Sequence, residues 1–149
     1  MPFTSFTCDV DASVDTLWRL LEDKIGNPGR YLPEVEEVAI LERAPEGVLR
    51  RMKTAVFEVT ERITTDRKRL EVSYVLVDHP EFAGHIVDRI TPAREDEPAG
   101  RPLLTVTLDW RPLDGTVTSE EDLLELITAA VLQTKELAEE AEQARQGKP

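Results

Sequence analysis

Residues 119–146 decide the fold, and their sequence is SEEDLLELITAAVLQTKELAEEAEQARQ. Apolar side chains recur here every three or four residues, which is the spacing of one face of a long helix. The residues on this face are Leu123, Leu124, Ile127, Val131, Thr134, Leu137, Ala138 and Ala141. The other face is acidic, includes Glu142, and is expected to be solvated. A helix with a single apolar face must bury that face against another element.

Upstream of this helix, apolar and polar residues alternate, which is the pattern of half-buried strands. In LEVSYVLV, residues 70–77, every second side chain from Leu70 to Leu76 belongs to one apolar face. The same alternation predicts seven strands, at residues 3–10, 35–43, 48–54, 57–65, 70–77, 82–91 and 103–111. Short turns join most of the later strands, so these strands pair antiparallel. The first strand can pair only by closing across the sheet.

Two short helices are predicted between the first strand and the second. Ser13 is a good N-cap for the first helix, which extends to about Asp23. Glycine and proline at residues 26–29 then interrupt the helical pattern. Residues 30–33 form the second element, a short helix or turn.

This order of elements predicts one α+β domain over residues 1–146, followed by a frayed tail at residues 147–149. A strongly curved antiparallel sheet of about seven strands would wrap around the long C-terminal helix. A curved sheet and a straight helix diverge at one end. The gap between them is expected to be a cavity.

Composition excludes several classes of function. The chain has 30 acidic and 18 basic residues, a net charge of −12, which argues against binding to nucleic acid or anionic membranes. One cysteine, Cys8, and two histidines are too few for a disulfide or a zinc site, and no metal or cofactor is expected. No signal peptide is expected from the first residues, and no apolar run approaches roughly 18 residues. A cytoplasmic protein is the simplest interpretation.

Four short motifs resemble a known superfamily. VDASVDTLW at residues 10–18 is similar to the strand-to-helix opening of START-like, or SRPBCC, proteins, which share the helix-grip fold with Bet v 1 allergens and polyketide cyclases. NPGRYLP at 27–33, ILER at 40–43 and VTERIT at 59–64 resemble, more narrowly, the AtaL-like subgroup. The resemblance implies a helix-grip fold. It also implies binding of hydrophobic ligands, polyketide cyclisation or co-chaperone work.

Polar residues on an apolar strand face are the informative ones, because such a face is expected to be buried. Glu61 shares its face with Val59 and Ile63. A carboxylate buried there must find a partner or take up a proton. The functional interpretation is a cavity acid or base, or an anchor for a polar ligand group. The structural interpretation is a salt bridge, or a strand end that reaches solvent.

Arg50 is placed to pair with Glu61 across the sheet. It shares a face with Met52, a further cavity candidate, while Arg51 takes the opposite side. The phase of residues 48–54 is not fixed by the sequence, so Arg50 and Arg51 can exchange roles. A pair between Arg50 and Glu61 fits a structural role, and it equally fits a site for an anionic ligand.

Four more residues complete the cavity candidates. Asp88 shares a strand face with apolar neighbours. Tyr74 and Trp110 lie on the apolar sides of their strands, and each has a polar group that usually forms a hydrogen bond when buried. Tyr31, in the second short element, either packs there or gates the mouth of the cavity. No catalytic residue is assigned.

Three functions of different classes remain open. The first and favoured one is a binding protein that holds a small hydrophobic or aromatic molecule in its cavity. The second is a polyketide cyclase- or aromatase-like enzyme that uses a cavity carboxylate. The third is a co-chaperone or a dimeric interaction module, and a homodimer is compatible with the sequence. A cavity above roughly 300 Å³ favours the first two, and a raised acid pKa inside it favours the enzyme.

Overall fold

The computed structural model describes residues 3–32, 35–55, 57–97, 100–114 and 120–147. The elements in chain order are β1 (Phe3–Asp9), α1 (Val14–Gly26), the 3-10 helix η1 (Pro28–Arg30), β2 (Val35–Ala44), β3 (Gly47–Thr54), β4 (Glu58–Asp66), β5 (Glu71–Leu76), β6 (Phe82–Thr91), β7 (Leu103–Pro112) and α2 (Glu120–Gln146). This order confirms the predicted α+β architecture. None of the helices in the described ranges combines the length and the apolar character needed to cross a membrane.

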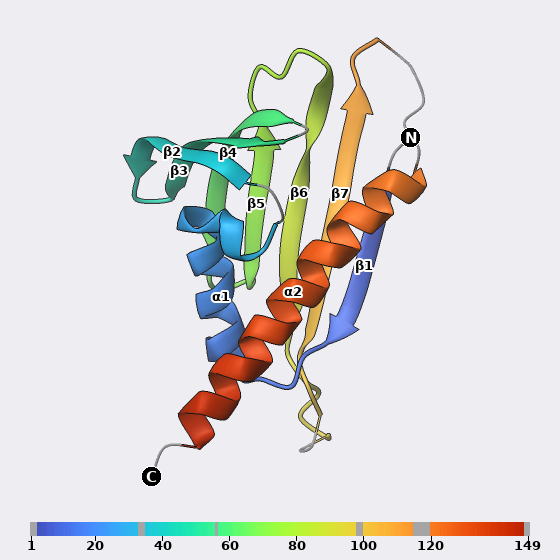
Figure 1. Ribbon diagram of the computed structural model, residues 1–149. Helices are drawn as coiled ribbons and strands as arrows, with labels where there is room; N and C mark the ends of the chain where they lie inside the picture. The colour runs from blue at the N-terminus through green and yellow to red at the C-terminus, as the bar shows by residue number, and fades with distance from the viewer. Residues whose placement is uncertain (1–2, 33–34, 56, 98–99, 115–119, 148–149) are drawn as a thin grey trace.

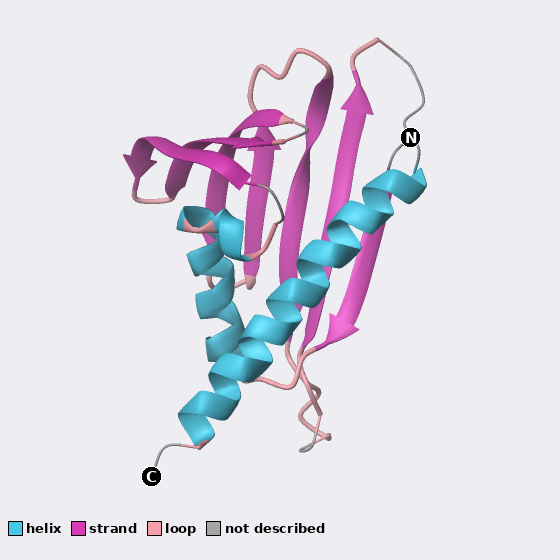
Figure 2. Ribbon diagram, viewed as in Figure 1, coloured by secondary structure: helices cyan, strands magenta, loops and turns pink. Residues whose placement is uncertain are grey.

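The seven strands form one antiparallel sheet in the order β1-β7-β6-β5-β4-β3-β2. Strands β2 to β7 each pair with their neighbours in the chain, and β1 closes across the sheet onto β7, as predicted. Figure 1 shows α2 crossing one face of the sheet, with α1 beside it and β2 and β3 turned away from the direction of β6 and β7. Figure 2 shows that both helices lie on the same face of this curved sheet.

Gly84 lets β6 and β7 approach closely beside the cavity. Its φ of +138° lies in a region that L side chains rarely adopt. A Cβ at this position would lie 1.9 Å from the Asp109 carbonyl oxygen, so any other residue would push the two strands apart. Gly84 is the register partner of Trp110, and it therefore sets how β7 presents that side chain.

The apolar face of α2 packs against β1, β7 and α1 much as predicted, with Ile127, Val131, Thr134 and Ala138 buried. Two predictions about this helix are wrong. Leu124 is 39% exposed, and Ala141 is exposed too. Glu142, expected in solvent, is only 5% exposed, because its carboxylate binds the start of α1. The predicted helix start at Ser119 lies outside the described residues.

The segment after β1 differs from prediction in its details. Ser13 is the N-cap of α1 as predicted, and its hydroxyl accepts a hydrogen bond from the Thr16 amide. The helix continues past Asp23 to Gly26. The second element is a single 3-10 turn at Pro28–Arg30 rather than at residues 30–33, because proline fits the first turn of a helix.

Candidate functional site

A small cavity lies between the concave face of the sheet and α2. Its volume is about 60 Å³, well below the roughly 300 Å³ at which small-molecule pockets begin. Most of its wall is apolar. The described residues that line it are Lys24, Leu32, Arg50, Met52, Phe57, Val59, Glu61, Tyr74, Ile86, Val106, Leu108, Trp110, Ile127 and Ala130.

The sheet register brings the polar side chains together at one side of this cavity. Tyr74 on β5 is the partner of Ile63 on β4 and of Ile86 on β6. Glu61 and Asp88 are each two residues from those partners, so all three side chains project from the same face of the sheet. Glu61, Tyr74 and Asp88 thus form a diagonal across three neighbouring strands, and all three are buried.

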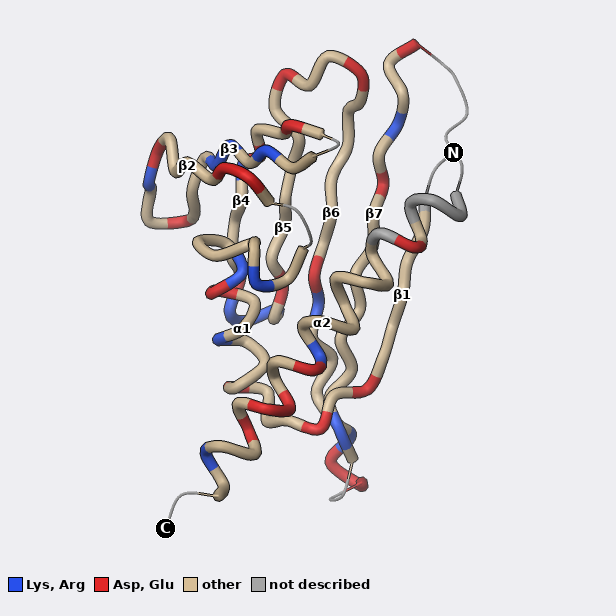
Figure 3. The backbone as a smooth tube through the Cα atoms, in the orientation of Figure 1, with Lys and Arg blue, Asp and Glu red and all other residues tan. Residues whose placement is uncertain are grey.

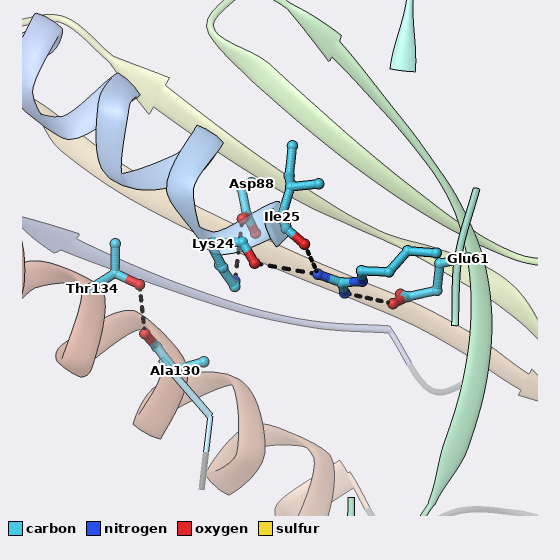
Figure 4. A network of polar contacts seen from close by, with 7 residues as sticks. Lys24, Ile25, Glu61, Asp88, Ala130 and Thr134 are labelled. Atoms are coloured by element: carbon cyan, nitrogen blue, oxygen red, sulfur yellow. Dashed lines mark hydrogen bonds and ion pairs between the residues drawn. The ribbon is translucent and has the colours of Figure 1, made fainter. Parts of the chain in front are cut away.

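Arg50 joins the sheet to the end of α1. It is the register partner of Glu61, and its Nη2 donates to Glu61 Oε1 at 2.9 Å. Its Nη1 donates to the carbonyl oxygens of Lys24, at 3.3 Å, and Ile25, at 2.9 Å. Figure 4 shows these contacts, with Lys24 and Ile25 at the end of α1 and Glu61 across from them. Arg50 therefore caps the C-terminal end of α1, where carbonyl groups lack helical partners.

The phase of β3, which the sequence left open, is settled by burial. The Arg50 side chain is 3% exposed and the Arg51 side chain 48% exposed. Arg50 therefore faces the interior, and the predicted pair with Glu61 is present.

Lys24 is a site residue that the sequence analysis missed. Its Nζ donates to Asp88 Oδ2 at 3.3 Å, and Asp88 is completely buried. Lys24 follows Leu21 by three residues, so it continues the apolar face of α1. A lysine at that spacing was the signal that could have found it, because only a partnered lysine is stable there.

The Tyr74 ring lies beside both cations. Lys24 Nζ is 5.5 Å and Arg50 Cζ is 5.6 Å from its centroid. The buried hydroxyl has no hydrogen bond of normal length and angle, nor has Oδ1 of Asp88. Burial raises the pKa of Tyr74 well above its usual range, and the nearby Asp88 carboxylate raises it further.

Glu61 has a raised pKa although Arg50 holds it. Burial is the largest cause, because it penalises the charged carboxylate, and Asp88 adds to it. The guanidinium of Arg50 and the ammonium of Lys24 act in the opposite direction without cancelling the effect of burial. Glu61 is thus a cavity acid whose proton uptake is favoured by its surroundings.

Aromatic rings also line the cavity, those of Phe57 and Trp110. Phe57 meets Trp110 edge to face, with ring centroids 6.4 Å apart, and Phe82 lies 5.7 Å from Trp110 on a tilted plane. His79 continues the cluster at 5.6 Å from Phe82. The indole Nε1 of Trp110 is buried without a hydrogen-bond partner. Together with Tyr74 Oη and Arg50 Nε, it is one of three unpaired polar atoms on the described lining residues.

A model of one protein family matches residues 10–145, and its description is acetylaranotin biosynthesis cluster protein L, AtaL. The chain belongs to the AtaL family. No curated protein matches this AtaL-family chain.

Two solved structures resemble the AtaL-family chain in fold. The Zhui aromatase/cyclase from Streptomyces sp. R1128 is 22% identical, with a TM-score of 0.63 over 96% of this chain and 92% of that one. TTHA0849 from Thermus thermophilus is 16% identical, with a TM-score of 0.74 over 94% of this chain and 99% of that one. At these identities the likeness shows the fold alone, and the fold is the SRPBCC-like helix grip that the sequence motifs implied.

Five of the seven residues that the sequence singled out in this AtaL-family chain line the cavity. They are Arg50, Met52, Glu61, Tyr74 and Trp110. Asp88 does not line it but lies behind Lys24 and Tyr74.

Tyr31 also does not line the cavity, because its hydroxyl donates to Asp23 on α1 at 2.7 Å. It packs between η1 and α1, which is the structural one of its two interpretations. Among the described residues, no three His, Cys, Asp or Glu side chains are arranged to hold a metal ion.

Proposed function

We propose that this chain binds a small hydrophobic molecule in the cavity between the sheet and α2. The observation that carries the proposal is the pair of unpaired donors on lining residues, Arg50 Nε and Trp110 Nε1, near the buried hydroxyl of Tyr74. Buried polar groups in native proteins nearly always have hydrogen-bond partners. A mostly apolar wall with a few such groups is the usual composition of a ligand pocket.

The size of the cavity limits how a ligand is held. At about 60 Å³ it is also smaller than the roughly 150 Å³ of an engineered cavity that binds benzene, so a bound molecule must move the walls apart. Leu32, Phe57 and Ile86 are the lining side chains that are only half-buried. They are the parts of the wall that can move at the lowest cost in lost packing.

Native mass spectrometry of the protein as purified from cells tests the proposal. A stoichiometric adduct that denaturation releases as a small apolar molecule supports it. Tyr74→Phe should then reduce occupancy of the adduct, whereas Ser73→Ala, a change at the next residue of β5, should not. A clean apo mass, together with no stabilisation by any member of an apolar ligand library, contradicts it. The same spectrum reports whether the chain is a monomer or a homodimer.

A second function is supported by one observation, the raised pKa of the cavity acid Glu61. An acid that retains its proton at higher pH can serve as a general acid or base in cyclisation of a polyketide-like substrate. Following aromatisation of a poly-β-carbonyl substrate by absorbance tests this function. Turnover that Glu61→Gln abolishes and Glu58→Gln leaves intact supports an enzyme, and turnover equal to the buffer rate contradicts it.

A further inference from the structure

We infer that the ligand of this cavity is an uncharged molecule that presents a hydrogen-bond acceptor, such as a carbonyl oxygen, to the polar side of the site. The inference rests on the proposed function and names its ligand class. Two observations carry it. The charges of the site already balance, and the polar atoms left unpaired on the described lining residues can all donate.

The charge balance follows from two ion pairs. Arg50 pairs with Glu61 at 2.9 Å, and Lys24 pairs with Asp88 at 3.3 Å. These four buried groups sum to zero charge when both carboxylates are ionised. Arg50 and Lys24 are the cations among the described lining residues, so a ligand carboxylate would meet none whose charge is still uncompensated. A buried charge without a partner is strongly unfavourable, and anionic ligands are therefore rejected.

The geometry of Arg50 points the same way. Its two terminal nitrogens already donate to Glu61 and to the carbonyl oxygens of Lys24 and Ile25. Three of its five N–H groups are used in these bonds, and Nε has no partner. The N–H groups that remain are on Nε and Nη2. Because Glu61 already compensates the charge of the guanidinium, these N–H groups suit a neutral acceptor better than a second carboxylate.

The other polar atoms of the lining residues also call for a ligand that accepts a hydrogen bond. The indole Nε1 of Trp110 donates only, and the hydroxyl of Tyr74 can donate. The Asp88 carboxylate, which does not line the cavity, lies beside the Tyr74 hydroxyl and competes for its proton. Trp110 Nε1 and Arg50 Nε have no such partner. A ligand with an acceptor atom can pair with a donor that a purely apolar ligand would leave buried and unpaired.

Three probes of nearly equal size separate the alternatives: ethylbenzene is apolar, acetophenone adds a carbonyl oxygen, and benzoate adds a negative charge. Their affinities can be measured at pH 7 by protein NMR titration, with the backbone amide signals of β5 and β7 as reporters. Acetophenone should bind roughly 2- to 10-fold more tightly than ethylbenzene, which is the contribution of one hydrogen bond. Benzoate should bind more weakly than ethylbenzene.

Two variants test which groups decide the preference. Tyr74→Phe should remove much of the advantage of acetophenone and leave ethylbenzene unchanged. Glu61→Gln retains an acceptor for Arg50 but removes one negative charge, so benzoate should gain at least about 10-fold. Glu58→Gln is the matched control, because its side chain is exposed on the same strand, and it should change none of the three affinities.

The outcomes distinguish this inference from the function on which it rests. Benzoate binding to the wild type as tightly as acetophenone overturns the inference and leaves the binding function standing. Equal affinities for acetophenone and ethylbenzene also overturn it. If none of the three probes shifts the signals of the cavity residues, both the proposed function and the inference fail.

Discussion

The two ends of α1 are both held by charged side chains from distant elements, but in opposite surroundings. At the N-terminal end, Glu142 of α2 accepts from the Ser13 amide at 2.6 Å and from the Thr16 hydroxyl at 3.2 Å. At the C-terminal end, Arg50 of β3 donates to two carbonyl oxygens. The first contact lies on the part of α2 where several acidic residues occur, drawn red in Figure 3, and the second involves Arg50 and Lys24, which line the cavity.

The difference between these two surroundings shows that the two contacts have different roles besides capping the helix. A helix needs acceptors at its first turn and donors at its last, and its dipole favours a carboxylate and a cation there respectively. Both ends of α1 follow this rule. Both capping groups are buried and have a counter-ion, but Arg145, the counter-ion of Glu142, is 58% exposed, whereas Glu61, the counter-ion of Arg50, is 4% exposed. Only at the C-terminal end does the stability of α1 depend on groups that line the cavity.

The largest effect is expected at the end that lines the cavity. Arg50→Met leaves Glu61 buried without its partner and the last carbonyl groups of α1 uncapped, so the free energy of unfolding should fall by about 3–5 kcal/mol. Urea denaturation measures this loss. Arg51→Met, at the exposed neighbouring position, is the control and should change stability by less than about 0.5 kcal/mol. Equal losses in the two variants would contradict the interior role of Arg50.

A smaller effect is expected at the N-terminal end. Glu142→Ala removes the acceptor for the Ser13 amide and should cost about 1–2 kcal/mol, the usual effect of losing a helix cap. Hydrogen exchange of the Ser13 amide should accelerate in the variant because this amide loses its acceptor. Exchange of the Thr16 amide, which donates to the Ser13 hydroxyl, should accelerate because Ser13 is held less firmly. Glu140→Ala, on the exposed side of the same helix, should leave both rates unchanged.

The two ends should also respond to acid in opposite directions. The hydrogen bond from the Ser13 amide is the main reason that the pKa of Glu142 lies below its usual value. Glu142 therefore contributes stability at neutral pH that disappears as the pH falls below about 4.5, its usual pKa, and through its folded value. The stability difference between wild type and Glu142→Gln should shrink over that range.

Glu61 should show the reverse, because burial raises its pKa. The folded protein then binds this proton more readily than the unfolded chain does, so acid favours folding at this residue. The stability of wild type relative to Glu61→Gln should increase as the pH falls through the folded pKa towards 4.5. Urea midpoints measured from pH 7 downwards report both differences, and parallel curves would contradict the contrast between the two ends.

The smallest effect is expected for a surface pair at the first turn of α1. Asp15 accepts from Arg67 at 2.7 Å, but both side chains are more than half exposed to solvent. Asp15→Asn should therefore cost less than about 1 kcal/mol, and added salt should reduce the difference further. A loss as large as that of Arg50→Met would contradict the expectation that solvent exposure makes this pair weak.

The sequence predicted the strands well because a strand that is buried on one face alternates apolar and polar residues. Residues 70–77, which contain β5, show this alternation. It predicted Glu61 and Tyr74 on the interior face for the same reason. The sequence could not decide whether Arg50 or Arg51 faces the interior. The two residues are adjacent and carry the same charge, and a shift of the strand by one residue exchanges their faces.

The errors arose where tertiary contacts override local pattern. Glu142 was predicted to be solvated with the acidic face of its helix. In the fold it is buried, because the start of α1 packs onto it and donates hydrogen bonds to its carboxylate. Tyr31 was a candidate for the cavity wall or its mouth, but its hydroxyl donates a hydrogen bond to Asp23 instead. Lys24 ends an apolar stripe and looks exposed unless its partner Asp88, 64 residues away, is known.

The contact between Glu142 and Ser13 also constrains the order of folding. The two residues are 129 positions apart in the chain, and β1 reaches its partner β7 over a similar distance. During synthesis the first strand and the first helix leave the ribosome long before the residues that pair with one and cap the other. Such long-range closure slows folding, since chain entropy is lost before the contacts form. β1 and α1 therefore remain without these partners until segments about 94 to 129 residues later in the chain have been made.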